Sequence, residues 1–93
     1  MAKYRFLATT QFKKDVKLCI RQGRSMDVLN KVITLLLDNG ELPPEYHPHK
    51  LSGRLRGLWE CHIQADWLLI WQQREDELVM IMTRTGTHSE VLK

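Results

Sequence analysis

The sequence has few cysteines, and neither of them belongs to a recognisable metal-binding or redox motif. Cys19 and Cys61 stand far apart in the chain, and neither has a CxxC spacing. We therefore expect two reduced thiols that pack as small apolar groups, because disulfides are rare in cytosolic proteins.

Long apolar runs are also missing. No run approaches the roughly 20 apolar residues of a membrane-spanning helix, so we expect no membrane segment. The first residues lack the apolar core of a secretory signal, and we expect the protein to stay in the cytoplasm. The length of 93 residues predicts one domain, residues 1–93, with a thin core.

Motifs of several common enzyme classes are absent. The chain has no glycine-rich phosphate-binding loop and no GxSxG elbow. Asp66 is the one acidic residue that we expect near the histidines, whereas a two-metal nuclease needs several. His47, His49, Cys61 and His62 are potential metal ligands, but no pair has the spacing of a zinc site. We therefore predict no metal and no other cofactor.

The charge of the chain favours a polyanionic partner. The formal net charge is +3 and the sequence pI is about 9.1, which makes nucleic acid the leading candidate. Lys13, Lys14 and Lys17 would share one face of a predicted helix. By default such a face is only a solvated surface, and the alternative is a basic track for RNA phosphates.

Hydrophobic periodicity predicts an α+β domain. Residues 3–8 alternate as in a strand, and two helices then follow. The first begins behind Thr9 or Thr10 and closes near Gly23, and the second runs from Ser25 to Gly40. With so short a link, the two helices should pack as an antiparallel hairpin.

The second half of the chain reads as a loop followed by a meander. Residues 41–53 are too rich in proline for a helix and too irregular for a strand. Three strand-like runs follow at residues 58–64, 67–73 and 78–85, which predicts an antiparallel meander. Thr87 and Glu90 match a capping box, so a short last helix should begin at Thr87.

Polar residues that suit RNA cleavage gather at one edge of this meander. The turns of a meander bring His62, Asp66 and Arg84 together, with His49 before the first strand and His88 after the last. Metal-free cleavage needs one group to take the proton of a 2′-OH, one to protonate the leaving 5′-oxygen, and a cation for the phosphorane. Histidine suits proton transfer because its ordinary pKa is near 6.5.

Each residue also has an ordinary structural interpretation. A surface histidine is usually solvated, and we favour that for His47. Arg84 could simply pair with a surface carboxylate. Trp67 and Trp71 share a face with Leu69, so at least one of them should be buried.

These segments resemble the YafQ branch of the RelE superfamily of type II toxin–antitoxin systems. The resemblance rests on the H-x-x-x-D-W motif at residues 62–67 and the R-T-G-T-H motif at residues 84–88. Residues 49–53 and 14–17 resemble the family's H-x-L-x-G element and first helix. The resemblance implies a RelE-like microbial ribonuclease fold and an mRNA interferase that cuts mRNA in the ribosomal A site. It also implies inhibition by a cognate antitoxin, which could be of the ribbon-helix-helix type.

Carried over by position, the resemblance assigns catalytic roles and RNA contacts. The catalytic positions are His49, His62, Asp66, Arg84 and His88, and Trp67 would contact RNA. Leu92 stands where the family often has an aromatic residue, so Trp67 would have to supply the base stacking expected there.

The working mechanism is an in-line attack that leaves a 2′,3′-cyclic phosphate and a 5′-OH. We expect His88 to act as general acid and either Asp66 or His49 as general base, while Arg84 and His62 hold the phosphate. The alternatives are a gyrase-binding toxin of the ParE kind and a basic RNA-binding module without activity. A toxin of the ParE kind has no reason to keep clustered histidines, which weighs against the first alternative.

Overall fold

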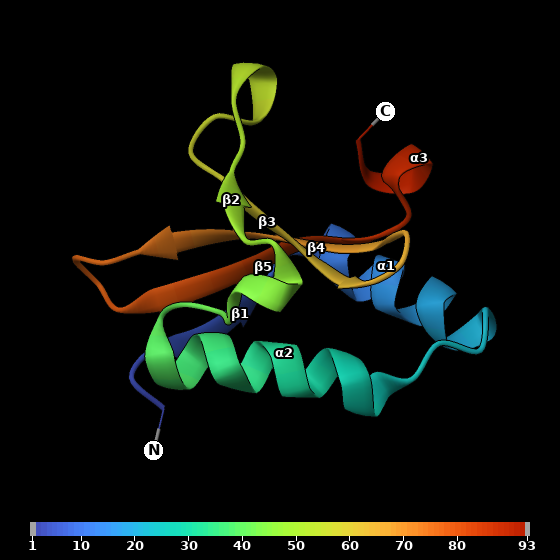
Figure 1. The fold of residues 1–93 in the computed structure, drawn as a ribbon, viewed down its shortest axis with the longest axis horizontal. Helices are drawn as coiled ribbons and strands as arrows, with labels where there is room; N and C mark the ends of the chain where they lie inside the picture. Colours follow the sequence, from blue (N-terminus) through green and yellow to red (C-terminus); the bar gives the residue numbers. More distant parts are fainter. Residues whose placement is uncertain (1, 93) are drawn as a thin grey trace.

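Five strands form one sheet in the order β1-β5-β4-β3-β2 (Figure 1). The computed structural model describes residues 2–92, so the two end residues of the predicted domain lie outside it. The strands are β1 (Arg5–Ala8), β2 (His49–Lys50), β3 (Trp59–Gln64), β4 (Trp67–Arg74) and β5 (Val79–Gly86). The helices are α1 (Thr10–Arg21), α2 (Met26–Asn39) and α3 (His88–Val91), with 3-10 turns at Pro44–Tyr46 and Gly53–Leu55. This arrangement confirms the predicted α+β class.

Both long helices begin and end where their capping residues stand. The Thr9 hydroxyl accepts a hydrogen bond from the Phe12 N–H at 2.9 Å, and Ser25 caps α2 in the same way. Gly40 closes α2 at φ 75°, a left-handed conformation that favours glycine. Thr87 and Glu90 form the predicted capping box of α3.

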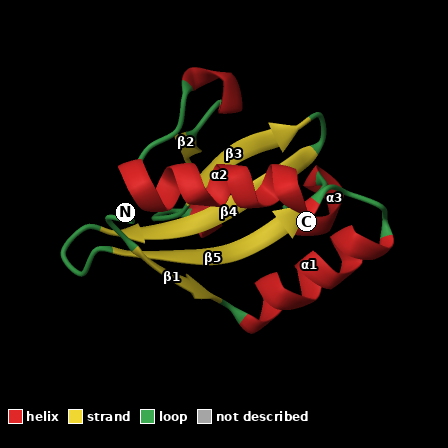
Figure 2. Cartoon of the chain, turned by 90° about the horizontal axis from the view of Figure 1, so that it is seen from below, coloured by secondary structure: helices red, strands yellow, loops and turns green. Residues whose placement is uncertain are grey.

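Side chains of β4 alternate between the two faces of the sheet. Trp67, Leu69 and Trp71 are buried against the face that α1 and α2 cover. The helix α1 packs beside the β1–β5 edge and α2 crosses the sheet towards β3 (Figure 2). The other face has a smaller apolar cluster of Leu68, Ile70 and Val91. Polar residues therefore fill much of that second face, which positions the candidate site there.

Two features of the fold differ from the sequence prediction. The predicted loop at residues 41–53 contains a 3-10 turn and the strand β2, which pairs antiparallel with β3 through His49–Glu60 and Lys50–Trp59. A strand of two residues is too short for alternation to reveal it. The first strand, β1, pairs parallel with β5, a long-range pairing that local pattern does not encode.

Among residues 2–92, no helix has both the length and the apolar character needed to cross a bilayer.

Candidate active site

Two β-bulges set which polar side chains face the site. In β5, Thr83 has no partner on β4, because Arg84 pairs with Ile70 and Met82 pairs with Trp71. The extra residue reverses the alternation, so Arg84 lies on the face of Ile70 instead of facing the helices as Met82 does. In β3 a second bulge at Ile63 follows the pairing of His62 with Leu68. His62 and Arg84 therefore share one face of the sheet, with β4 between them.

All four histidines of the chain gather on or beside this face. We call His47, His49, His62 and His88 the histidine cluster. The ring of His62 contacts two other rings of the cluster. Its centroid lies 5.7 Å from that of His47 and 5.8 Å from that of His88. Both contacts are edge to face. An open hollow lined by His47, His62 and the turn at residues 63–65 lies beside the cluster.

Asp66 fixes the orientation of His88. It occupies the β3–β4 turn at φ 45°, a left-handed conformation that aspartate tolerates better than most residues. Its Oδ1 accepts hydrogen bonds from the backbone N–H of His88 at 3.1 Å and from Nδ1 of the His88 ring at 3.0 Å. These bonds, that from the ring first, lower the pKa of Asp66 below its ordinary value. An ionised carboxylate only accepts, so Nδ1 carries a proton and Nε2 is the atom left for chemistry.

Glu60 is a buried carboxylate that the sequence interpretation missed. It is 3% exposed, and its Oε1 lies 3.2 Å from Nε2 of His49. The other ring nitrogen of His49, Nδ1, donates to the carbonyl of His47 at 2.9 Å. Both ring nitrogens of His49 therefore face acceptors, and the ring is held between the carbonyl of His47 and the carboxylate of Glu60. The Oε2 atom of Glu60 is buried and has no hydrogen-bond partner among the described residues.

A sequence signal for Glu60 exists. It stands two residues before His62 in a strand, so both side chains must lie on the same face. A charged residue between Trp59 and Cys61 is also unexpected in a buried strand.

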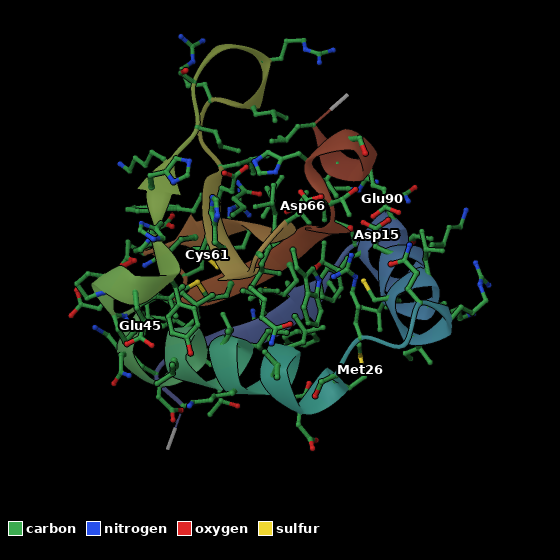
Figure 3. All side chains as sticks on the ribbon, turned by 45° about the vertical axis from the view of Figure 1, so that its right-hand side comes forward. Asp15, Met26, Glu45, Cys61, Asp66 and Glu90 are labelled. Carbon is green, nitrogen blue, oxygen red and sulfur yellow. The ribbon has the colours of Figure 1, made fainter. Side chains whose placement is uncertain are left out.

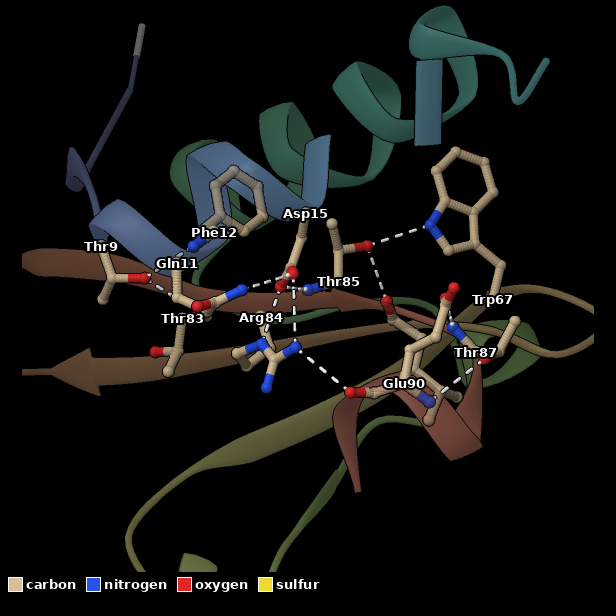
Figure 4. A network of polar contacts seen from close by, with 11 residues as sticks. Thr9, Gln11, Phe12, Asp15, Trp67, Thr83, Arg84, Thr85, Thr87 and Glu90 are labelled. Carbon is tan, nitrogen blue, oxygen red and sulfur yellow. Dashed lines mark hydrogen bonds and ion pairs between the residues drawn. The ribbon is translucent and has the colours of Figure 1, made fainter. Parts of the chain in front are cut away.

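Arg84 is held by a second buried carboxylate, Asp15 of α1 (Figure 4). Its Nε donates to Oδ2 of Asp15 at 2.7 Å, and its Nη2 donates to Oδ1 at 3.3 Å and to the carbonyl of Glu90 at 3.2 Å. Asp15 also accepts from the Thr85 N–H at 3.1 Å and from Gln11 at 3.0 Å. The arginine therefore ties α1 and α3 to β5, and only its Nη1 group has no hydrogen bond to the described residues.

The carboxylates of Asp15, Asp66 and Glu90 lie near α3, and that of Asp15 is buried (Figure 3). The Arg84 side chain, 30% exposed, reaches the surface among them. The predicted pairing of Arg84 with a carboxylate is thus found, but the partner is buried and comes from α1.

Trp67 does not lie where the resemblance suggested. Its side chain is fully buried on the helix-covered face, and its Nε1 donates to the hydroxyl of Thr85 at 3.0 Å. That hydroxyl donates in turn to the carbonyl of Leu68 at 2.8 Å. A buried indole cannot stack on a base in this conformation, so the structure corrects the RNA-contact assignment of Trp67. The sequence predicted that at least one of Trp67 and Trp71 is buried, and the structure shows that both are.

Of the other predicted RNA contacts, Leu92 lies next to His88, to whose carbonyl its backbone N–H donates at 2.9 Å, whereas the three lysines lie away from the histidine cluster. Leu92 is half-buried against Leu68 and Ile70, which makes it part of the small apolar cluster. Lys13, Lys14 and Lys17 are exposed on α1, beside the β1–β5 edge of the sheet. Three histidines of the cluster lie towards the opposite edge, with His49 on β2, His47 just before it and His62 on β3, whereas His88 lies on α3.

Three residues of the described chain could hold a metal ion. One ligand atom each of Glu60, His62 and His88 lies within 4.8 Å of the others. Imidazole and carboxylate ligands suit zinc or copper(II). The set differs from the one considered from sequence because Cys61 faces the helices, where burial raises the pKa of its thiol to about 12.

Comparison with known proteins identifies the family. A family model described as the bacterial toxin YafQ of type II toxin–antitoxin systems matches residues 4–93. The mRNA interferase toxin YafQ of Escherichia coli K12 is 36% identical over 80 residues, which cover 85% of each chain. The chain therefore belongs to the YafQ family of bacterial type II toxins.

Solved structures of relatives share the fold over nearly the whole chain. The toxin in the E. coli DinJ–YafQ toxin–antitoxin complex superposes with a TM-score of 0.88 at 32% identity, covering 98% of this chain and 99% of that one. A metal-bound toxin from Helicobacter pylori superposes with a TM-score of 0.86 at 33% identity and the same coverage.

Proposed function

We propose that this chain is a metal-independent endoribonuclease that cuts mRNA on the ribosome in the cytoplasm, as the toxin of a type II pair. The observation that carries the proposal is the set of Glu60, His62 and His88, which bring one polar atom each within 4.8 Å of one another. Arg84 lies on the same face of the sheet. The E. coli relative, an mRNA interferase, supports the choice of mRNA as substrate.

The general acid in this proposal is Nε2 of His88. The hydrogen bond from Nδ1 to Asp66 fixes the ring, and the carboxylate stabilises the imidazolium form that can give a proton. Asp66 is therefore a positioning residue. Its lowered pKa and its two bonds from His88 make it a poor base, which removes one of the two bases considered from sequence.

The general base is Glu60, paired with His49. Its Oε2 has no hydrogen-bond partner in the described chain and lies on the same face as His62. Because this atom is buried in the free protein, the proposal requires bound RNA to displace the side chains that cover it. Glu60 takes the 2′-OH proton as the 2′-oxygen attacks the adjacent phosphorus. The bond from phosphorus to the 5′-oxygen breaks, and that oxygen takes the proton of His88. The products are a 2′,3′-cyclic phosphate and a 5′-OH.

The phosphate is held by His62 and by the Nη1 group of Arg84. Because Nε and Nη2 of Arg84 already bind Asp15 and Glu90, the arginine offers one nitrogen to the phosphate. This contact stabilises the charge that develops on the phosphorane.

A cognate antitoxin is the proposed partner. The E. coli relative forms a complex with its antitoxin DinJ. The antitoxin would inhibit cleavage by covering or rearranging the histidine cluster. An antitoxin gene beside the gene of this chain would support the proposal.

Expression without an antitoxin tests this function. The wild-type chain should arrest growth, and primer extension should find new 5′ ends within mRNA coding regions. His88→Ala should abolish both effects, while Lys31→Ala, on the exposed side of α2, should leave both intact. A folded His88→Ala protein with full toxicity contradicts the assignment, and arrest with altered DNA supercoiling but intact mRNA favours a gyrase-binding toxin.

Metal chelation tests the absence of a metal cofactor. The H. pylori relative is a metal-bound toxin, and Glu60, His62 and His88 offer the ligands for a similar ion here. In our proposal such an ion would occupy the groups that transfer protons. Cleavage should therefore survive EDTA and fall when zinc is added. Loss of cleavage in EDTA with recovery on adding a divalent ion would overturn the mechanism. Because EDTA also damages ribosomes, the protein is treated with EDTA first and the chelator is removed before the ribosomes and mRNA are added.

A further inference from the structure

The segment between β2 and β3 carries positive charge that the catalytic proposal does not use. Residues 49–59 contain Lys50, Arg54 and Arg56 and no acidic residue. All three cationic side chains are exposed. The Lys50 ammonium lies 5.5 Å from the centroid of the Trp59 ring, so this lysine is partly engaged within the protein. We call residues 50–58 the basic loop.

The base of the basic loop is fixed to the face of the sheet that carries the histidine cluster. The N–H of Leu51 donates to the carbonyl of Leu58 at 2.9 Å, which closes the loop. Both leucines pack against the buried pair Leu68 and Ile70. Arg54 and Arg56 are therefore exposed residues of an anchored turn, whose position relative to the site is set by apolar contacts.

The basic loop also joins two residues of the proposed catalytic machinery. His49 comes directly before it, and Glu60 follows two residues after it. The loop and α3 rise on the same side of the sheet (Figure 1). The lysines of α1 lie instead beside the opposite edge, because β1 and β2 are the two outer strands.

We propose that Arg54 and Arg56 of the basic loop bind backbone phosphates of the mRNA strand that passes through the site. This inference rests on the proposed ribonuclease function. Arginine suits the role because its guanidinium presents several donors to phosphate oxygens. The strand that is cut must lie against His49 and Glu60. The next phosphates along it therefore come within reach of a loop that begins directly after His49 and ends two residues before Glu60.

Binding of a non-cleavable RNA at different salt concentrations tests the inference. A 2′-O-methyl oligoribonucleotide has no attacking hydroxyl, so the wild-type protein binds it without cutting it. Each phosphate contact to single-stranded RNA contributes about 0.7 to the slope of log affinity against log salt. Arg54→Ala/Arg56→Ala should therefore lower the slope by about 1.4. Between 50 and 200 mM salt, the wild type should lose about sevenfold more affinity than this variant.

A charge-matched variant controls for net charge. Lys14→Ala/Lys17→Ala also removes two positive charges, but from α1, and should change the slope by less than half as much. Equal slopes for the wild type and the arginine variant, or an equal loss in the lysine variant, would overturn the inference. Thermal unfolding establishes that each variant is folded, and Arg54→Gln/Arg56→Gln replaces the alanine pair if that pair unfolds.

Binding to ribosomes stripped of mRNA distinguishes contacts with the substrate strand from contacts with ribosomal RNA. If the arginine variant binds the oligonucleotide normally but loses affinity for empty ribosomes, the loop contacts ribosomal RNA and the inference is wrong. A wild-type chain that binds the oligonucleotide but never cleaves mRNA contradicts the proposed function, whereas the salt slopes still decide the role of the loop.

Discussion

Replacing Asp15 with asparagine should weaken both the fold and the proposed catalysis. The substitution keeps the shape of the side chain and removes its charge. In the wild type, the two carboxylate oxygens accept from four donors on Arg84, Thr85 and Gln11. Asparagine has one oxygen and one NH₂ group, so two of these donors would face another donor.

The expected loss of stability lies between two limits. Breaking a fully buried ion pair costs about 3–5 kcal/mol, and losing one hydrogen bond to a charged group costs about 1.5–3 kcal/mol. The Asp15 side chain is 8% exposed but that of Arg84 is 30% exposed, so water can partly replace the lost partner. We expect Asp15→Asn to lower the free energy of unfolding by about 2–3 kcal/mol.

The expected loss of cleavage follows from the position of Arg84. Without Asp15, the guanidinium keeps its charge but loses the partner that aims Nη1 at the phosphate. We expect the single-turnover cleavage rate to fall about tenfold to a hundredfold, equivalent to about 1.4–2.7 kcal/mol in the transition state.

Urea unfolding and single-turnover cleavage on the same samples measure the two effects. Asp38→Asn, an exposed aspartate on α2, is the control and should stay within about 0.5 kcal/mol of the wild type. The positioning role is refuted if Asp15→Asn cleaves at the wild-type rate. It is also refuted if the rate falls only by the fraction of unfolded protein, because Asp15 would then serve stability alone.

Other predictions concern Asp66, Thr85 and Cys61. The lowered pKa of Asp66 means that its contribution is complete at neutral pH and is lost as pH falls through the folded pKa. The difference in Tm between the wild type and Asp66→Asn should therefore begin to shrink near the ordinary aspartate pKa of about 3.9 and disappear only below the lowered folded pKa, and a constant difference would contradict this. Thr85→Val leaves the buried indole N–H of Trp67 without an acceptor and should cost about 1–3 kcal/mol by urea unfolding. Because burial raises the pKa of Cys61 to about 12, its thiol should react with iodoacetamide at pH 8 only after unfolding, and rapid reaction in the native state would disprove its burial.

Local signals in the sequence were enough for most elements of the fold. Capping residues such as Thr9, Ser25 and Gly40 mark the helix ends, and the continuous apolar run at residues 67–71 marks a strand buried on both faces. These signals act between near neighbours, and therefore a single sequence displays them. The parallel pairing of β1 with β5 joins residues more than 70 positions apart, and no local pattern specifies it.

The candidate site was predictable where it depends on turns and not where it depends on packing. A meander necessarily brings the turn residue Asp66 close to the end of β5, and so Asp66 and His88 were placed together correctly. The sequence did not reveal that burial prevents Trp67 from contacting RNA, because a family motif does not show which way an indole points. The partner of Arg84 was hidden for a different reason. Asp15 lies on a helix whose charged residues look like a solvated face until α1 is docked on β5.

The bulge at Thr83 shows why side-chain alternation alone would have given the wrong site. In an unbroken strand, Arg84 would share the face of Met80 and Met82, which pack under the helices. A charge there would be desolvated and unable to reach RNA. One unpaired residue shifts the register, so that Arg84 faces α3 and Thr85 turns inwards to accept the indole N–H of Trp67. The same irregularity thus satisfies a buried donor on one face and supplies a cation to the other, and only the pairing of β4 with β5 reveals it.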